Sequence, residues 1–137
     1  MPDPVDTNVV VRYLIEDPAR IAAEFRGVFP FFRRLERGED TALLTPLVLF
    51  QTYFVLTTYY EVPRTIAAAR LRDLLAFRGL RIPEKPVLRL CLDTLSRRSV
   101  DLVDAYLTAL CKTRQLGGIH SFDRRLRRLG VELLPVE

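Results

Sequence analysis

The chain has 137 residues, of which 49% are hydrophobic and 28% charged. This composition is typical of a globular protein and excludes a disordered or fibrous chain, so we expect a single domain over residues 1–137. The apolar runs are too short for a membrane span, and the N-terminus lacks the pattern of a secretory signal. We therefore expect a cytoplasmic protein without membrane contact.

The net charge is +4, and all but two of the 21 basic residues are arginine. The planar guanidinium group suits phosphate, which favours a polyanionic partner, although the base composition of a genome would give the same bias. The two cysteines, Cys91 and Cys111, lack the spacing of metal ligands. We expect both to be buried, reduced thiols.

Short apolar strands alternate with longer amphipathic helices along the chain. This alternation predicts a mostly parallel sheet covered by helices on both faces. The expected strands are residues 4–6, 41–44, 80–82, 118–121 and 131–134. The expected helices begin near residue 6, span 18–37, 45–60, 63–77, 86–95 and 101–115, and begin again at 123.

Several single residues sharpen these predictions. Asp6 or Thr7 is expected to cap the first helix, and Thr45 the helix that has proline at its first position. Pro30 should kink or split the helix over residues 18–37. His120, the only histidine, is expected to be a packed core residue.

Three aspartates each lie at the end of a predicted strand or in the first turn of a helix: Asp6, Asp104 and Asp123. In a parallel sheet such positions meet at one edge, and clustered carboxylates favour a bound cation. Oxygen ligands without histidine or cysteine indicate Mg²⁺ or Mn²⁺. Each aspartate could instead only cap its helix.

Three segments together resemble the PIN-domain family of RNA nucleases, and most closely the toxin ribonucleases of toxin–antitoxin modules (VapC-like). DTNVVVRYLI from Asp6 resembles the first family motif, VDAYLTAL the motif that contains Asp104, and HSFDRRLRRLGVELL the closing motif with Asp123. The resemblance implies a three-layer α/β/α, Rossmann-like domain with a central sheet of about four to five strands. It also implies hydrolysis of RNA phosphodiester bonds at a Mg²⁺ or Mn²⁺ site.

The segment over residues 45–60 is similar to the second motif of the family, in which an acidic residue is usual. Gln51 stands in that position, and it lacks the charge and the basicity of a carboxylate. The resemblance therefore leaves two alternatives open. One is a toxin-type ribonuclease, and the other is a catalytically weakened or inactive PIN-like module that binds RNA or protein.

The resemblance also assigns roles to the residues. Asp6 and Asp104 are expected to bind the metal directly and Asp123 through water, while Gln51 would position a water molecule. Asn8, Ser121 and Asp101 would support the site. The expected RNA contacts are Arg12, Arg124 and Arg125, which flank the acids in the sequence.

The apolar helices over residues 45–60 and 63–77 would suit a homodimer or a cognate antitoxin protein. A phosphotransfer enzyme of the haloacid-dehalogenase or receiver type also has aspartates at strand ends. The first would need a second aspartate where Asn8 stands. Both would need a lysine at a late strand end, where neither Lys85 nor Lys112 is predicted to lie.

Overall fold

The computed structural model describes all 137 residues. The elements, in chain order, are α1 (Thr7–Ile15), η1 (Ala23–Phe25), α2 (Val28–Arg37), β1 (Ala42–Leu43), α3 (Pro46–Phe54), η2 (Val55–Tyr59), α4 (Arg64–Leu74), β2 (Leu80–Arg81), α5 (Lys85–Arg97), α6 (Leu102–Arg114), β3 (Ile119–His120), η3 (Arg124–Leu129) and β4 (Leu133–Leu134). The molecule is mostly helical, and its strands are short.

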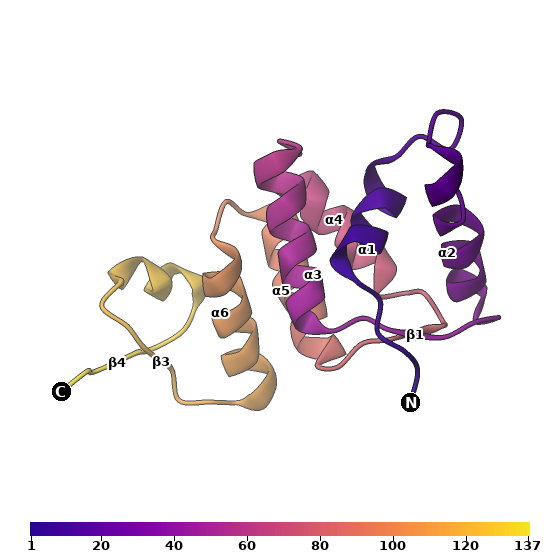
Figure 1. Ribbon diagram of the computed structural model, residues 1–137. Coiled ribbons are helices and arrows are strands. Elements are labelled where there is room, and N and C mark those ends of the chain that lie inside the picture. Colours follow the sequence, from indigo (N-terminus) through magenta and orange to yellow (C-terminus); the bar gives the residue numbers. More distant parts are fainter.

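The helices follow one another along an elongated molecule (Figure 1). α1 and α2 lie toward one end, α3, α4 and α5 form the middle, and α6 separates them from residues 119–134, which we call the C-terminal unit. The main hydrophobic core contains 24 buried residues, and α4 and α5 contribute fully buried leucines to it, Leu71, Leu88, Leu92 and Leu95. A second cluster of four buried residues holds the C-terminal unit against α6: Cys111, Ile119, Leu126 and Leu129.

The strands form two separate parallel pairs. β1 pairs with β2, and Pro4 makes a single parallel bridge to Leu43 beside them. β3 pairs with β4 in the C-terminal unit. The α/β class with parallel strands is confirmed. The expected continuous sheet of four to five strands is not formed, because neither β3 nor β4 hydrogen-bonds to the strand at Pro4.

The local signals at helix ends are mostly confirmed. The Asp6 carboxylate accepts a hydrogen bond from the Thr7 backbone N–H at 2.7 Å, and Thr45 Oγ1 accepts one from the Val48 N–H at 3.2 Å. The expected break at Pro30 is wrong, since η1 and α2 are separated at Gly27 and Pro30 lies in the first turn of α2. Proline is tolerated there because the first N–H groups of a helix have no partner within it.

Other expectations concern burial. Cys91 and Cys111 are buried free thiols, as predicted, and burial raises the pKa of the Cys91 thiol to about 12. The expectation for His120 is wrong, because its side chain is exposed and its Nδ1 lies 2.9 Å from the Pro135 carbonyl oxygen. Strand alternation places Ile119 inward and therefore turns the next residue outward. None of the helices has the length and apolar character needed to cross a membrane.

Gly79 lies directly before β2 and connects it to α2, because the Gly79 N–H donates a hydrogen bond to the Leu35 carbonyl at 2.7 Å. A Cβ there would overlap the Asp40 carbonyl oxygen and lie 2.9 Å from that of Leu35. We expect Gly79→Ala to lower the free energy of unfolding by roughly 2 kcal/mol or more, measured by urea denaturation.

Gly27→Ala is the matched control for this prediction. Gly27 has helical angles (φ −60°, ψ −15°), and a Cβ there would meet nothing within 4 Å. This change should stabilise the protein by about 0.5 kcal/mol. Equal effects of the two substitutions would contradict the close approach at Gly79.

Candidate functional site

Acidic side chains from α6 lie beside η3. Asp101, at the N-cap of α6, and Asp104, in its first turn, line a cleft of about 320 Å³, which we call the acid cleft. Arginines also line it, so that both signs of charge meet there. Its lining residues are Arg64, Arg98, Ser99, Val100, Asp101, Asp104, Arg125, Leu126, Arg128 and Leu129.

Asp104 is the half-buried acid of this cleft. Burial raises its pKa above the ordinary value, and the carboxylates of Asp101 and Asp123 raise it further, whereas Arg125 opposes them. A neighbouring negative charge raises the pKa of a carboxyl group only at short range, so the carboxylates of Asp101 and Asp123 lie near that of Asp104. The structure thus brings together two of the three predicted acids, Asp104 and Asp123, and places the predicted supporting residue Asp101 beside them.

Asp123 is bound by Arg125 in a two-bond ion pair. Arg125 Nε and Nη2 donate to the two carboxylate oxygens at 3.0 Å each, and the Arg125 backbone N–H donates to Oδ1 at 3.0 Å. These hydrogen bonds lower the pKa of Asp123. The Asp123 N–H donates to Ser121 Oγ at 3.0 Å. Ser121 therefore shapes the turn that presents Asp123.

A second hollow of about 380 Å³ adjoins Asp101 and Asp104. Tyr53 of α3 lines it, is only 2% exposed, and its hydroxyl has no hydrogen-bond partner. Burial raises the pKa of Tyr53, so the hydroxyl stays a neutral donor. Tyr53, Arg64 and Arg98 were not predicted as residues of the site. Tyr53 follows Gln51 and Thr52, so three successive polar groups in a mainly apolar helix were the signal present for it.

The other half of the predicted site lies at the start of α1. Asp6 is the exposed N-cap residue, and the Thr7 hydroxyl donates to Gln51 Oε1 at 2.7 Å. This bond joins α1 to α3 and fixes the amide of Gln51, whose side chain is exposed. Asp6 and Gln51 are therefore neighbours through Thr7, but neither lines the acid cleft.

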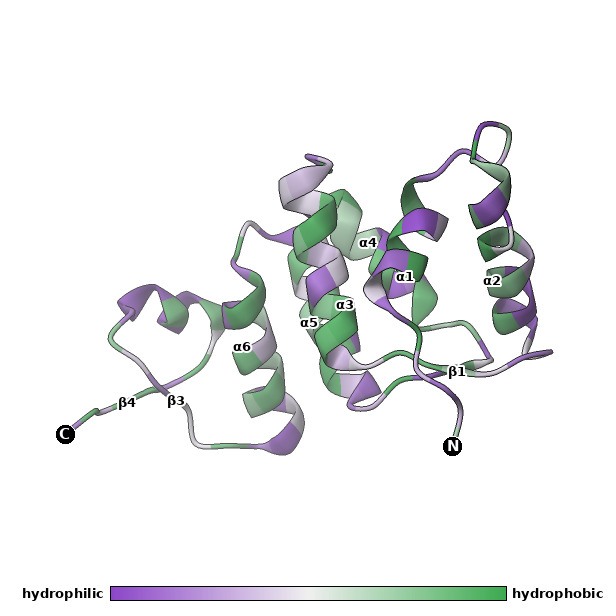
Figure 2. Ribbon diagram, viewed as in Figure 1, coloured by the Kyte–Doolittle hydropathy of each residue, from purple (hydrophilic) through white to green (hydrophobic).

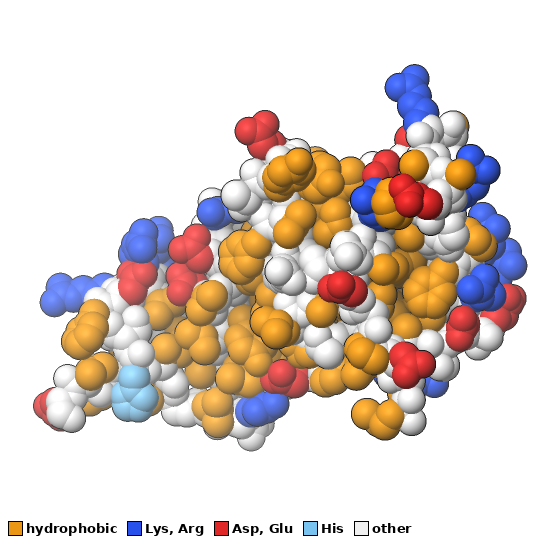
Figure 3. Space-filling model, in the orientation of Figure 1, with side chains coloured by type: hydrophobic (Ala, Val, Ile, Leu, Met, Phe, Trp, Pro, Cys, Tyr) orange, Lys and Arg blue, Asp and Glu red, His pale blue; other side chains and the backbone are white.

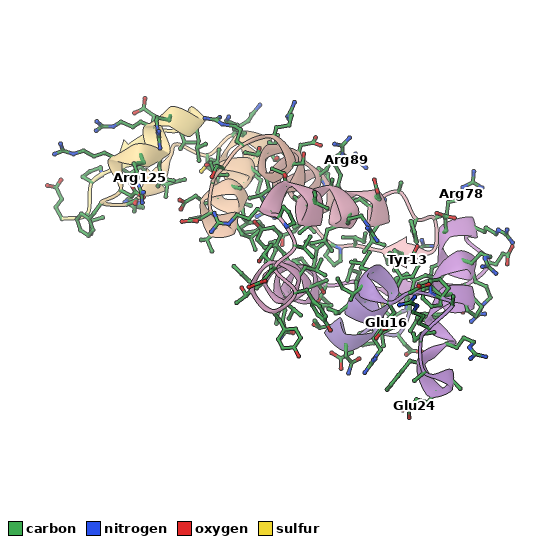
Figure 4. All side chains as sticks on the ribbon, turned by 90° about the horizontal axis from the view of Figure 1, so that it is seen from above. Tyr13, Glu16, Glu24, Arg78, Arg89 and Arg125 are labelled. Carbon is green, nitrogen blue, oxygen red and sulfur yellow. The ribbon has the colours of Figure 1, made fainter.

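Arg12 and Asn8 line a different hollow, beside α2. The guanidinium carbon of Arg12 lies 3.4 Å from the Phe25 ring centroid, and Arg12 Nη1 lies 3.1 Å from Glu16 Oε1. Arg12 is thus already held by two neighbours. Arg125 lies at one end of the molecule in Figure 4, whereas Tyr13 and Glu16, which mark α1, lie toward the other. Arg124, next to Arg125, is exposed.

The expected metal site would need Asp6, Asp104 and Asp123 within reach of one ion. No group of three or more acidic, histidine or cysteine side chains lies close enough to hold a metal ion. The acids are divided between the acid cleft and the start of α1. Within one chain, the residues present therefore do not form the predicted site of Asp6, Asp104 and Asp123.

The unpartnered Tyr53 hydroxyl should cost stability. We expect Tyr53→Phe to raise the free energy of unfolding by roughly 1 kcal/mol, because it removes a buried polar group that has no hydrogen bond. Tyr106→Phe is the matched control, since the Tyr106 hydroxyl donates to Glu84 Oε1 at 2.8 Å. This second change should destabilise the protein, and opposite signs in urea denaturation are the expected result.

The raised pKa of Asp104 predicts a pH-dependent stability. The folded state disfavours the ionised carboxylate, so Asp104 lowers the free energy of unfolding above its ordinary pKa. In acid the group is protonated in both states, and this cost disappears. Asp104→Asn should therefore stabilise the protein near about pH 7 and have little effect near about pH 3. An equal effect of Asp104→Asn at the two pH values would contradict this prediction.

The family model described as PIN domain matches residues 5–132. Members of this family are generally metal-dependent nucleases that bind RNA. The search of curated proteins and the search of solved structures returned no match. Because the family match covers nearly the whole length, the chain belongs to the PIN-domain family.

Proposed function

We propose that the chain is an endoribonuclease that hydrolyses RNA phosphodiester bonds and needs Mg²⁺ or Mn²⁺. The observation that supports this proposal is the acid cleft, where the carboxylates of Asp101 and Asp104 lie among arginines. Carboxylates alone would repel an RNA backbone. A divalent cation offsets their charge, and arginines at the rim attract phosphate.

The roles follow the sequence resemblance. Asp104 and Asp6 are the proposed metal ligands, with Asp123 acting through water and Gln51 positioning a water molecule. Asp6 and Gln51 lie outside the acid cleft of the single chain, so this set of residues requires the two halves of the site to meet. Asn8, Ser121 and Asp101 are supporting residues. Arg124 is exposed and free to contact the RNA backbone, whereas Arg125 would have to share its guanidinium between phosphate and Asp123.

A toxin of a toxin–antitoxin module is the proposed biological setting, with action on RNA in the cytoplasm. The support is an apolar groove of about 770 Å³ along α3 and η2, lined mainly by Leu47, Phe50, Phe54, Val55 and Tyr59. Leu47 is 77% exposed and Tyr59 76%. Figures 2 and 3 show hydrophobic residues over this face of α3 and α6. Such a groove suits an apolar helix of an antitoxin or of a second copy.

A second candidate function is a PIN-like module that binds RNA or protein without cutting. The observation that favours it is the amide of Gln51, held by Thr7 in the place of the usual acid. An amide cannot accept a proton at neutral pH and attracts a cation less than a carboxylate does. This alternative predicts binding of RNA without turnover.

The first test is cleavage of a mixed-sequence RNA in the presence of Mg²⁺ or Mn²⁺. We expect cleavage that stops on chelation and that falls by about a hundredfold or more in Asp104→Asn, because that change removes a charge from the acid cleft. Asp17→Asn, remote from the cleft, should leave the rate unchanged. Cleavage that continues unaltered in Asp104→Asn would refute the proposed site, and binding without cleavage would favour the non-catalytic module.

The second test is Gln51→Glu. Thr7 can donate to a carboxylate as it does to the amide, so the substitution adds a negative charge in a position that is already held. We expect metal affinity and cleavage rate to rise about ten- to a hundredfold. Gln115→Glu, at the C-cap of α6, is the matched control. If Gln51→Glu raises neither metal affinity nor cleavage rate, the missing charge at residue 51 does not limit the activity of the site.

A further inference from the structure

The first strand has an unpaired outer edge. The Val5 N–H donates to the Leu43 carbonyl at 3.0 Å, and the Leu43 N–H donates to the Asp3 carbonyl at 2.8 Å. Since backbone groups alternate along a strand, the Pro4 carbonyl and the Asp6 N–H point to the other side. Neither of these two groups makes a hydrogen bond. This edge therefore offers one acceptor and one donor next to a candidate site residue.

β3 has a second unpaired edge. The Ile119 N–H donates to the Glu132 carbonyl at 2.9 Å, so the backbone groups of Ile119 face β4. The N–H and carbonyl of His120 consequently point away from β4, and no other strand lies beside β3. This edge offers one donor and one acceptor at an exposed residue.

The two edges complement each other. In a parallel bridge between Val5 and His120, the His120 N–H would donate to the Pro4 carbonyl, and the Asp6 N–H to the His120 carbonyl. Asp6 would then lie beside Ser121, two residues before Asp123. Pairing of these edges would bring the start of α1 and the acid cleft into one site.

Within a single chain this pairing is blocked by the packing of α6. Leu102, Ala105 and Ala109 fix α6 in the main core, while Cys111 packs with Ile119 of β3. The C-terminal unit is therefore fastened to α6 on the side away from the first strand. α6 lies between the C-terminal unit and the rest of the molecule in Figure 1. Closure within one chain would break this packing, whereas a second copy can reach the edge without doing so.

We propose that two copies of the chain exchange strand contacts, so that β3 of each copy pairs with residues 4–6 of the other. The reciprocal arrangement is a closed two-fold dimer with two equivalent sites. Phe122, which follows this edge and is 85% exposed, would be covered by the partner copy. Each site then takes Asp6 and Gln51 from one copy and Asp104 and Asp123 from the other. The composition of this shared site rests on the proposed function, but the strand pairing does not.

The pairing is tested by cysteine cross-linking. Neighbouring strands place paired Cα atoms about 5 Å apart, which is within the range for a disulfide. A mixture of the single variants Val5→Cys and His120→Cys should form a covalent heterodimer of about twice 15.8 kDa under oxidation. Val5→Cys mixed with Thr113→Cys, an exposed position on α6, is the matched control and should stay uncross-linked.

The double variant Val5→Cys/His120→Cys distinguishes the partner. A covalent dimer on a non-reducing gel supports exchange between copies. A cross-linked monomer would show that the edges meet within one chain, and no cross-link would show that they do not meet. Sedimentation of the unmodified protein gives a measurement that does not depend on any variant folding. We expect a dimer, and a monomer at all concentrations would overturn the proposal.

Complementation tests the shared site. Asp6→Asn and Asp104→Asn chains, unfolded together and refolded, should regain about a quarter of the unmodified activity, because half of the dimers are mixed and each mixed dimer has one intact site. The shared site would be overturned if the unmodified enzyme is active, both single variants are inactive, and the refolded mixture recovers no activity. If the unmodified chain does not cleave RNA, the proposed function fails, while cross-linking and sedimentation still decide the strand exchange.

Discussion

Helix α6 is packed on both sides, and the rest of the molecule depends on this constraint. Ala105 and Ala109 have small side chains that let α6 approach the main core closely, and both are about 1% exposed. The other side of the helix holds the C-terminal unit through Cys111. Burial of apolar surface on both sides stabilises this arrangement by roughly 25 cal/mol per Å². It also sets where the two aspartates at the start of α6 lie, next to η3 and far from α1.

The Asp104 carboxylate in the acid cleft works against folding, and Arg125 only partly offsets this effect. Asp104 has a raised pKa because burial and two neighbouring carboxylates disfavour its charge. Asp123 has a lowered pKa because Arg125 holds it with two side-chain hydrogen bonds. The ionised form of Asp104 is therefore disfavoured, whereas that of Asp123, which pairs with Arg125 of the cleft, is stabilised. A disfavoured charge is common where a site is made for a ligand rather than for stability.

The helices and their caps could be predicted because they depend on neighbours in the sequence. Asp6, Thr45 and the αL residue Gly38 that ends α2 all act within one or two turns. The division of the sheet could not be predicted, since strand pairing depends on contacts between distant segments. The same limit applies to the site: the pattern identifies the acids, but whether Asp6 meets Asp104 depends on where α6 packs. The burial of residues 119–120 likewise depends on where α6 packs: Ile119 packs with Cys111, so the next side chain, His120, faces outward.

The bond between Thr7 and Gln51 bears on which activity the site retains. The Thr7 hydroxyl donates to Oε1, so the amide oxygen is held toward α1, while the side chain as a whole is exposed. An amide NH₂ group is a poor ligand for a cation but a good donor to a phosphate oxygen. Under the proposed function, Gln51 would therefore contribute to binding of RNA rather than of a metal ion. Metal binding would then depend on the remaining carboxylates. Because the single chain divides these acids between two places, the proposed activity would depend both on assembly of the site and on the charge at residue 51.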